Sequence, residues 1–118
     1  MKKINEVKKL LKKLQKDLAL TKAKDIEIID IKNRSALGDY MIIVSGTSSR
    51  HINSIVNNIV KLNKKFVNST EGLNSTDWLI VDFGDIILNV FKPEARKHYS
   101  LEKIWKNNDL KEEKVGFG

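Results

Sequence analysis

Two apolar runs separated by a single glycine constrain the fold of this chain more than any other feature. The first run is Trp78–Phe83 (WLIVDF) and the second is Asp85–Phe91 (DIILNVF), with Gly84 between them. Both runs are rich in β-branched and aromatic residues, which favour strands, and the glycine favours a tight turn. The sequence therefore predicts an antiparallel β-hairpin over residues 78–91.

Side chains alternate along both predicted strands, so the hairpin has two different faces. One face is apolar and carries Leu79, Val81, Phe83, Ile86, Leu88 and Val90. The other face mixes apolar and polar groups, namely Trp78, Ile80, Asp82, Ile87, Asn89 and Phe91. The first face is expected to pack against helices, whereas a half-apolar face with a tryptophan is typical of a protein-binding surface. The alternative is that a helix of the same chain covers the mixed face and that Trp78 is a core residue.

The first half of the chain predicts two helices and two strands. Apolar residues recur every three or four positions from Ile4 to Leu18, with lysines between them, which indicates an amphipathic helix. Strands are expected over Asp25–Ile31 and Tyr40–Ser45, and a second helix over the apolar positions Ile52, Ile55, Val56, Ile59 and Val60. Ser48 or Ser49 is the expected N-cap of that helix.

The rest of the chain predicts one more helix. Asn68–Asp77 is read as a polar loop, and Pro93 is suited to the first turn of a helix that continues through Ala95–Trp105. The order α-β-β-α-β-β-α predicts a single α/β (α+β) domain with a mixed sheet of four to five strands. We expect this domain to span residues 1–106 and residues 107–118 to form a charged, flexible tail.

Composition excludes several classes of protein. The chain has no cysteine, which rules out disulfides and thiolate metal sites, and no apolar run approaches the roughly 20 residues that cross a bilayer. The N-terminal segment lacks the features of a signal or transit peptide, so a cytoplasmic location is expected, with no membrane partner. The formal net charge is +7 and rests almost entirely on lysine, which favours contact with a polyanion such as RNA.

Few residues suggest catalysis. His51 and His98 stand far apart with no ligand-like spacing, so no metal and no cofactor are expected. A nucleotidyl-transfer site is the enzymatic alternative, with the turn beginning at Gly46 holding phosphate and with Asp82 and Asp85 holding Mg²⁺. Two carboxylates three residues apart across a glycine turn do not share a strand face, which argues against that site.

Several motifs together resemble the ribosomal silencing factor family, also called Iojap-like. They are DYMIIVSGTSSRH (residues 39–51), Glu71-Gly72, WLIVDFGD (residues 78–85) and KPEARKHYSLEKIW (residues 92–105). The resemblance covers about residues 4–106. One departure is Asn89, where the family usually has histidine.

The resemblance implies a nucleotidyltransferase-like fold without catalytic carboxylates and a function that is not enzymatic. Members of the family repress translation by binding the large ribosomal subunit through its ribosomal protein fourteen, which blocks joining of the small subunit. On this sequence, the resemblance implies partner binding by Trp78, Asp82, Asp85, Lys92, Pro93, Glu94, Arg96 and Tyr99. The mixed face of the hairpin adds Ile80, Asn89 and Phe91 to the predicted partner-binding residues.

The lysine-rich first helix offers a second surface. We expect it to add attraction to ribosomal RNA through its exposed lysines, Lys8, Lys9, Lys12 and Lys13. If that face dominates, the chain is instead an RNA-binding ribosome assembly factor. An exposed edge strand would also permit a weak homodimer.

Overall fold

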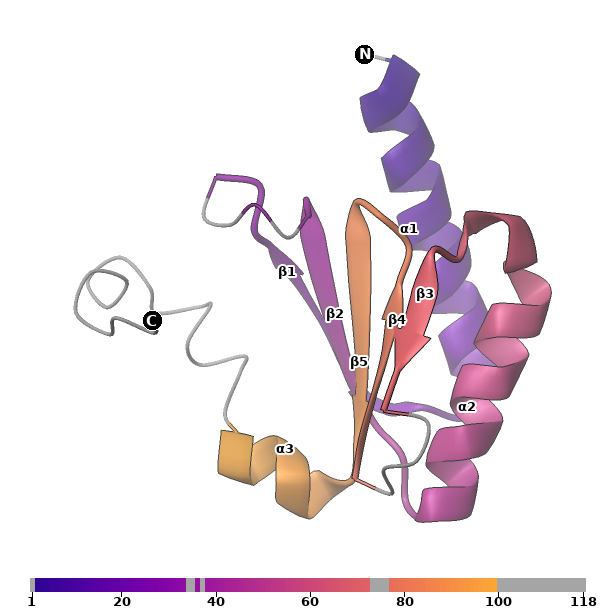
Figure 1. Ribbon diagram of the computed structural model, residues 1–118, viewed down its shortest axis with the longest axis vertical. Helices are drawn as coiled ribbons and strands as arrows, with labels where there is room; N and C mark the ends of the chain where they lie inside the picture. Colours follow the sequence, from indigo (N-terminus) through magenta and orange to yellow (C-terminus); the bar gives the residue numbers. More distant parts are fainter. Residues whose placement is uncertain (1, 34–35, 37, 73–76, 100–118) are drawn as a thin grey trace.

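A five-stranded sheet forms the centre of the protein, as a computed structural model shows (Figure 1). The structure describes residues 2–33, 36, 38–72 and 77–99. The strands are β1 (Lys24–Asp30), β2 (Tyr40–Ser45), β3 (Ser69–Glu71), β4 (Trp78–Asp82) and β5 (Ile86–Phe91). The helices are α1 (Lys2–Leu20), α2 (Ser49–Leu62) and α3 (Pro93–Tyr99), with a short 3₁₀ helix, η1, at Lys64–Phe66.

The sheet has the strand order β1-β2-β5-β4-β3 and is mixed. β2 and β5 are parallel, and the other neighbouring pairs are antiparallel. The predicted hairpin is confirmed as β4 and β5, whose turn is closed by a hydrogen bond from Phe83 N to Ile86 O at 2.9 Å. Gly84 lies in this turn with φ +91°, a backbone conformation that glycine adopts easily and that residues with a side chain rarely adopt.

One expectation about the strands is wrong. Residues 69–71 were expected to lie in a polar loop, but they form β3, which pairs with β4 at the edge of the sheet. This short polar segment has little intrinsic strand propensity, and the backbone hydrogen bonds of β4 supply its order. β1 and β3 are the two edges of the sheet.

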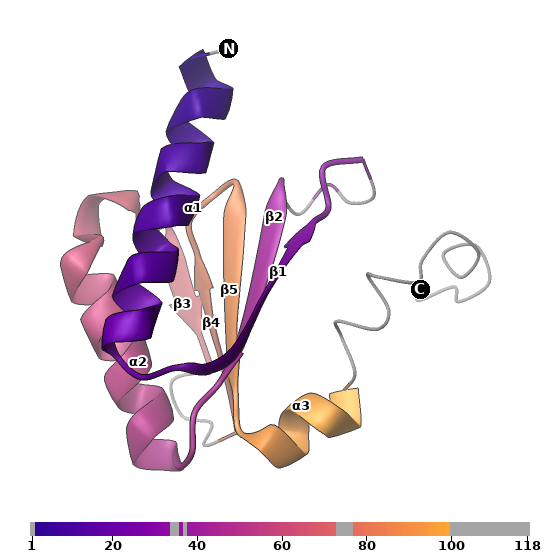
Figure 2. The ribbon, with the colours of Figure 1, turned by 180° about the vertical axis from the view of Figure 1, so that it is seen from behind.

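Helices α1 and α2 cover one face of the sheet, and α3 lies at one end of the other face (Figures 1 and 2). The predicted apolar face of the hairpin joins one buried cluster with Leu14 and Leu18 of α1 and with Ile55 and Ile59 of α2. Ser48 caps α2, since its side chain accepts a hydrogen bond from His51 N. Within the described part of the chain, no helix is both long enough and apolar enough to cross a membrane. The predicted tail, residues 107–118, lies outside the described residues.

Candidate functional site

The candidate site lies on the face of the sheet opposite α1 and α2, which we call the open face. Strand register arranges its side chains in rows, because directly paired residues point to the same side. Ser45, Phe91 and Trp78 form one row, and Ile43, Asn89 and Ile80 form the next. The first row lies at the end of the sheet where β5 leads into α3.

Trp78 is the central aromatic side chain of this site. Its ring stacks on that of Phe91 with centroids 4.8 Å apart and an interplanar angle of 27°. Its indole Nε1 donates a hydrogen bond to Asn89 Oδ1 at 3.0 Å. Trp78 and Ile80 are both half-buried, so each keeps part of its surface accessible. Trp78 is therefore held in one orientation while it remains available to a partner.

Asn89 and Phe91 require a correction, because both were predicted to contact a partner directly. Their exposed fractions are 2% and 1%, and Phe91 belongs to a second buried cluster with Ile29, Ile31, Met41 and Ile43. The open face is therefore filled over β1, β2 and β5 and accessible mainly over β4. Asn89 and Phe91 support Trp78 from below rather than forming the surface themselves.

α3 extends the site beyond the end of β5. Lys92 N donates to Asp77 O at 3.0 Å, and the Lys92 ammonium lies 3.7 Å from Asp77 Oδ1. Arg96 reaches back from α3, and its Nη1 donates to Ser45 Oγ at 2.9 Å. Pro93 and Glu94 are exposed at the start of the helix. The backbone of Tyr99 ends α3, and its side chain lies outside what the structure describes.

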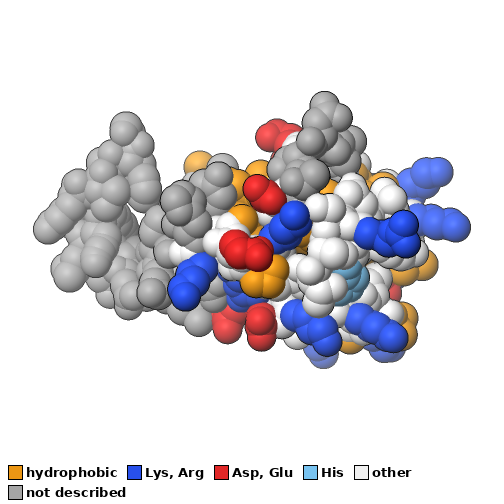
Figure 3. All heavy atoms as spheres, turned by 90° about the horizontal axis from the view of Figure 1, so that it is seen from below, with side chains coloured by type: hydrophobic (Ala, Val, Ile, Leu, Met, Phe, Trp, Pro, Cys, Tyr) orange, Lys and Arg blue, Asp and Glu red, His pale blue; other side chains and the backbone are white. Residues whose placement is uncertain are grey.

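We call the group Trp78, Ile80, Lys92, Pro93, Glu94 and Arg96 the docking surface. At the end of the molecule where α3 lies, acidic and basic side chains alternate around a small hydrophobic area (Figure 3). A small apolar area with a charged rim is the usual composition of a protein interface. Asp77 and Ser45, which hold Lys92 and Arg96, were not predicted as site residues. The position of Ser45 could have been predicted from the sequence, because strand alternation places this serine on the same face of β2 as Met41 and Ile43.

Asp82 and Asp85 lie apart from the docking surface. Asp82 pairs with Ile87, four residues from the position of Trp78, which corresponds to roughly 13 Å along a strand. Its Oδ1 accepts a hydrogen bond from Gly84 N at 2.7 Å, so it stabilises the hairpin turn. Asp85 lies in that turn and lines a small groove with Val7 and Leu10 of α1. The resemblance placed both carboxylates in one site with Trp78, and the strand separates them from it.

The same separation argues against nucleotidyl transfer. Gly46 follows β2, and its N–H donates to Phe91 O at 2.9 Å, at the α3 end of the sheet. Asp82, which precedes the hairpin turn, and Asp85, which lies in it, are at the opposite end of the sheet. A phosphate held by the Gly46 turn would therefore lie a full strand length from both carboxylates, too far for a shared Mg²⁺ ion.

His51 has a structural position. Its Nδ1 accepts from Thr47 N at 2.8 Å, so its Nε2 carries the hydrogen and donates to Thr21 O at 3.0 Å. Nδ1 thus binds the turn before α2, and Nε2 connects the start of α2 to the end of α1. The side chain of His98 lies outside the described residues. Among the described residues, no group of three or more histidines and carboxylates is placed to hold a metal ion.

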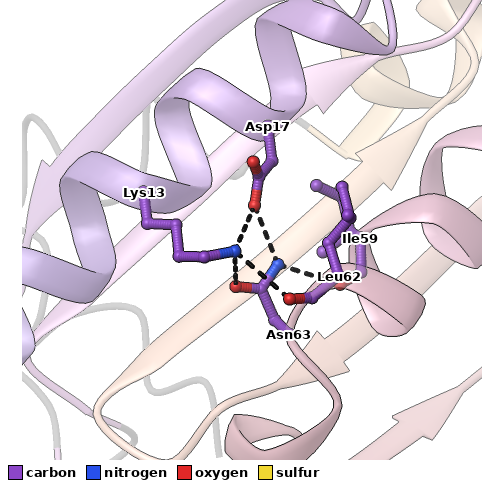
Figure 4. A network of polar contacts seen from close by, with 5 residues as sticks. All are labelled: Lys13, Asp17, Ile59, Leu62 and Asn63. Atoms are coloured by element: carbon purple, nitrogen blue, oxygen red, sulfur yellow. Dashed lines mark hydrogen bonds and ion pairs between the residues drawn. The ribbon is translucent and has the colours of Figure 1, made fainter.

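The lysines of α1 divide into two kinds. Lys8, Lys9 and Lys12 are exposed, as expected for an RNA-facing surface. Lys13 instead donates to Asp17 Oδ2 at 2.9 Å, Asn63 Oδ1 at 2.8 Å and Leu62 O at 3.2 Å (Figure 4). An ammonium group has three hydrogens, so this network uses all of them and leaves Lys13 no donor for a phosphate. Its main role is to join α1 to the C-terminal end of α2.

Comparison with known proteins decides the family. A family model described as "Ribosomal silencing factor during starvation" matches residues 4–116. The chain belongs to the ribosomal silencing factor family. The match extends beyond residues 4–106, the stretch over which the sequence motifs suggested this family.

Relatives of this chain include bacterial ribosomal silencing factors and a mouse protein with a mitochondrial name. The chain is 36% identical to the ribosomal silencing factor of Zymomonas mobilis over 90% of this chain and 82% of that protein. It is 37% identical to the Haemophilus influenzae factor over 81% of this chain and 97% of that protein. A mouse protein named "Mitochondrial assembly of ribosomal large subunit protein 1" is 38% identical over 70% of this chain and 39% of its own length.

Two solved structures are similar in fold to this chain. A Chromobacterium violaceum crystal structure has a TM-score of 0.78 and 28% identity, covering 84% of this chain and 85% of that one. A Bacillus halodurans structure has a TM-score of 0.74 and 26% identity, covering 83% and 94% of the two chains. The predicted α+β class and mixed sheet are thus shared with known proteins of similar sequence.

Proposed function

We propose that this protein binds the large ribosomal subunit through ribosomal protein fourteen and blocks joining of the small subunit. Family membership supports ribosome binding, and the name of the mouse relative refers to the large subunit. The mechanism requires no chemistry. A bound domain of this size, placed where the small subunit docks, prevents the contact by occupying the space. The factor is expected to act in the cytoplasm.

The observation that carries the proposal is the fixed, half-buried Trp78. Interfaces draw much of their affinity from a few aromatic and arginine side chains near the centre of the contact. Trp78 loses little side-chain entropy on binding, because Asn89 and Phe91 already hold it. Lys92, Glu94 and Arg96 supply charges beside it, which favour one orientation of the partner.

The docking surface forms only part of the proposed contact. A standard protein interface covers about 800 Å² on each partner, which exceeds the area of a few side chains. We therefore expect the contact to extend from α3 across the accessible part of β4 towards Ile80. Asp82 lies further along the same strand, so it is expected to contribute at the rim of the interface rather than at its centre.

The test is co-sedimentation of purified large subunits with the protein, followed by addition of small subunits. The wild type should migrate with large subunits and reduce the yield of joined ribosomes. Trp78→Ala should lose most of the binding, whereas Asp82→Lys should weaken it less. Leu20→Ala is the matched control, because Leu20 is 75% exposed on α1, on the other side of the sheet. Unchanged binding of the Trp78→Ala/Asp82→Lys double variant would overturn the proposal.

Assembly of the large subunit is a second candidate function, favoured by the name of the mouse relative. In this role the protein would bind the same ribosomal protein, but before the large subunit is complete. Loss of the factor should then lead to accumulation of large-subunit precursors in growing cells. A repressor that acts only on finished subunits should instead leave the precursor level unchanged and raise the yield of joined ribosomes.

A further inference from the structure

A groove between α1 and η1 lies on the helix-covered side of the sheet, away from the docking surface. It has a volume of about 360 Å³ and is lined by Glu6, Lys9, Leu10, Lys13 and Phe66. A smaller groove continues from it past Val7 to Phe83 and Asp85. The volume lies in the lower part of the range for small-ligand sites, which is roughly 300–1,000 Å³.

Phe66 is the unusual residue of this groove. It is 40% exposed although it is a large aromatic side chain, and the ammonium of Lys65 lies 5.5 Å from its ring centroid. The other apolar lining of the larger groove is Leu10, which is half-buried. This apolar area is too small to hold the row of hydrophobic anchors by which a helical peptide docks. It is suited to a single flat ring.

Charge around the groove is divided. Four exposed lysines lie on the elements that form the groove or lead into it, on α1, on the last turn of α2 and on η1, namely Lys9, Lys61, Lys64 and Lys65. Two carboxylates also line the grooves, that of the exposed Glu6 and that of the half-buried Asp85. An anion is therefore favoured beside the lysines and disfavoured beside these two carboxylates. A neutral ring with hydrogen-bond donors is favoured beside the carboxylates, because a carboxylate accepts from them.

We propose that this groove binds an unpaired nucleotide of RNA, with its base stacked on Phe66 and its phosphates beside these lysines. A nucleotide combines a flat ring, amino donors and an anionic backbone, which matches the three parts of the groove. Aromatic side chains beside lysines are the usual platform for single-stranded nucleic acid. The choice of RNA over DNA follows from membership of a family of ribosomal silencing factors. Binding here is independent of the docking surface.

Glu6 gives the site a preference among bases. The carboxylate accepts a hydrogen bond from the N4 amino group of cytosine, as acidic side chains do in nucleic-acid recognition. Uracil has a carbonyl oxygen at the same position, which the carboxylate repels. Cytosine and uracil are otherwise alike in size and shape, so the two bases isolate this contact.

The test is fluorescence anisotropy of the full chain with labelled oligo-C and oligo-U RNA over a range of salt concentrations. Oligo-C should bind several-fold tighter than oligo-U, and Glu6→Gln should reduce that difference. Phe66→Leu should weaken oligo-C binding about tenfold, within the range for loss of one stacked base, and leave the salt dependence unchanged. Lys65→Gln should reduce the salt slope by about 0.7, whereas Lys24→Gln, a control on β1, should not.

Three results would overturn the proposal. The first is equal affinity of the wild type for oligo-C and oligo-U. The second is oligo-C binding that Phe66→Leu does not change, since the contact is then diffuse attraction to lysines. The third is a poly-glutamate peptide that binds as tightly as oligo-C and responds equally to Phe66→Leu, since the site then takes an acidic protein segment. Thermal melting of each variant checks its folding, and Trp78→Ala should leave RNA binding unchanged, which separates this proposal from the docking surface.

Discussion

Trp78 Nε1 on β4 donates a hydrogen bond to Asn89 Oδ1 on the neighbouring strand β5, at 3.0 Å. This contact fixes the orientation of the Asn89 amide, because rotating it by half a turn would bring two donors together. In that orientation, Asn89 Nδ2 is buried and has no hydrogen-bond partner within the described part of the chain. Asn89 thus holds Trp78 in place with one end while its other end is unsatisfied.

Asn89→Leu should separate the positioning of Trp78 from the stability of the fold. The change removes a hydrogen bond but also removes an unsatisfied amide group, so the free energy of unfolding should change by no more than about 1 kcal/mol. Trp78 loses its fixed orientation, and binding to large subunits should weaken severalfold. Urea unfolding and co-sedimentation measure the two effects.

Asn89→His is the matched control for that experiment. Histidine can accept from the indole with one ring nitrogen and donate with the other, and it is the residue that the family usually has here. This variant should bind large subunits as well as the wild type does. If Asn89→Leu also binds normally, Asn89 has no role in positioning Trp78.

Lys13→Gln should destabilise the fold, although the Lys13 side chain is 45% exposed. Its ammonium joins Asp17 and Asn63, whose exposed fractions are 7% and 1%, and its loss leaves a buried carboxylate with one partner fewer. The expected loss is about 1–3 kcal/mol in the free energy of unfolding. Lys12→Gln, one position earlier and exposed, should change it by less than about 0.5 kcal/mol. Equal urea midpoints for the two variants would contradict this assignment.

Periodicity alone located most of the fold. The alternation in residues 78–91 predicted both faces of the hairpin. The N-cap of α2 was predicted as Ser48 or Ser49, because both precede an apolar helical repeat, and the structure selects Ser48. β3 was not predictable, because Ser69–Glu71 is short and polar and becomes a strand only by pairing with β4. Its order is a property of the assembled sheet rather than of its own residues.

The candidate site was less predictable than the fold. Asp82 is close to Trp78 in sequence, yet an extended strand advances about 3.3 Å per residue and carries the carboxylate away. The family motif contains both residues without indicating this separation. The role of Lys13 was also hidden, because it depends on how α1 packs against the end of α2, some fifty positions along the chain.

The pKa of Lys32 is raised to about 12, and Tyr40 is the principal cause. Lys32 Nζ donates to the Tyr40 hydroxyl at 3.1 Å and to Asp30 Oδ2 at 2.9 Å, and both bonds favour the charged ammonium. Because the folded value lies above the ordinary 10.5, this stabilisation is complete below pH 10.5 and is lost as the pH rises through about 12.

Tyr40→Phe should lower the pKa of Lys32 towards its ordinary value, because the hydroxyl is lost while the ring remains. Nitrogen-detected NMR titration of the lysine side chains measures the shift directly. Asp30→Asn should also lower the value, because it removes the negative charge beside the ammonium. A Lys32 pKa of about 12 in the Tyr40→Phe variant would show that the hydroxyl is not the main cause.

Gly72→Ala should disturb the docking surface from outside it. Gly72 has φ +80°, and a Cβ at this position would lie 2.5 Å from the backbone oxygen of Trp78, so the start of β4 must move. Gly84→Ala is the matched control, since Gly84 also has a positive φ of +91° but its Cβ would meet only Asn68 Nδ2 at 3.4 Å. The control should lose about 1–2 kcal/mol in the free energy of unfolding from the backbone conformation alone. Gly72→Ala should lower the free energy of unfolding by more than the control does. It should also weaken binding to large subunits, because the clash falls on the backbone of Trp78 itself. Equal losses of stability in the two variants, with normal binding in both, would mean that the close approach of Gly72 to Trp78 does not constrain this surface.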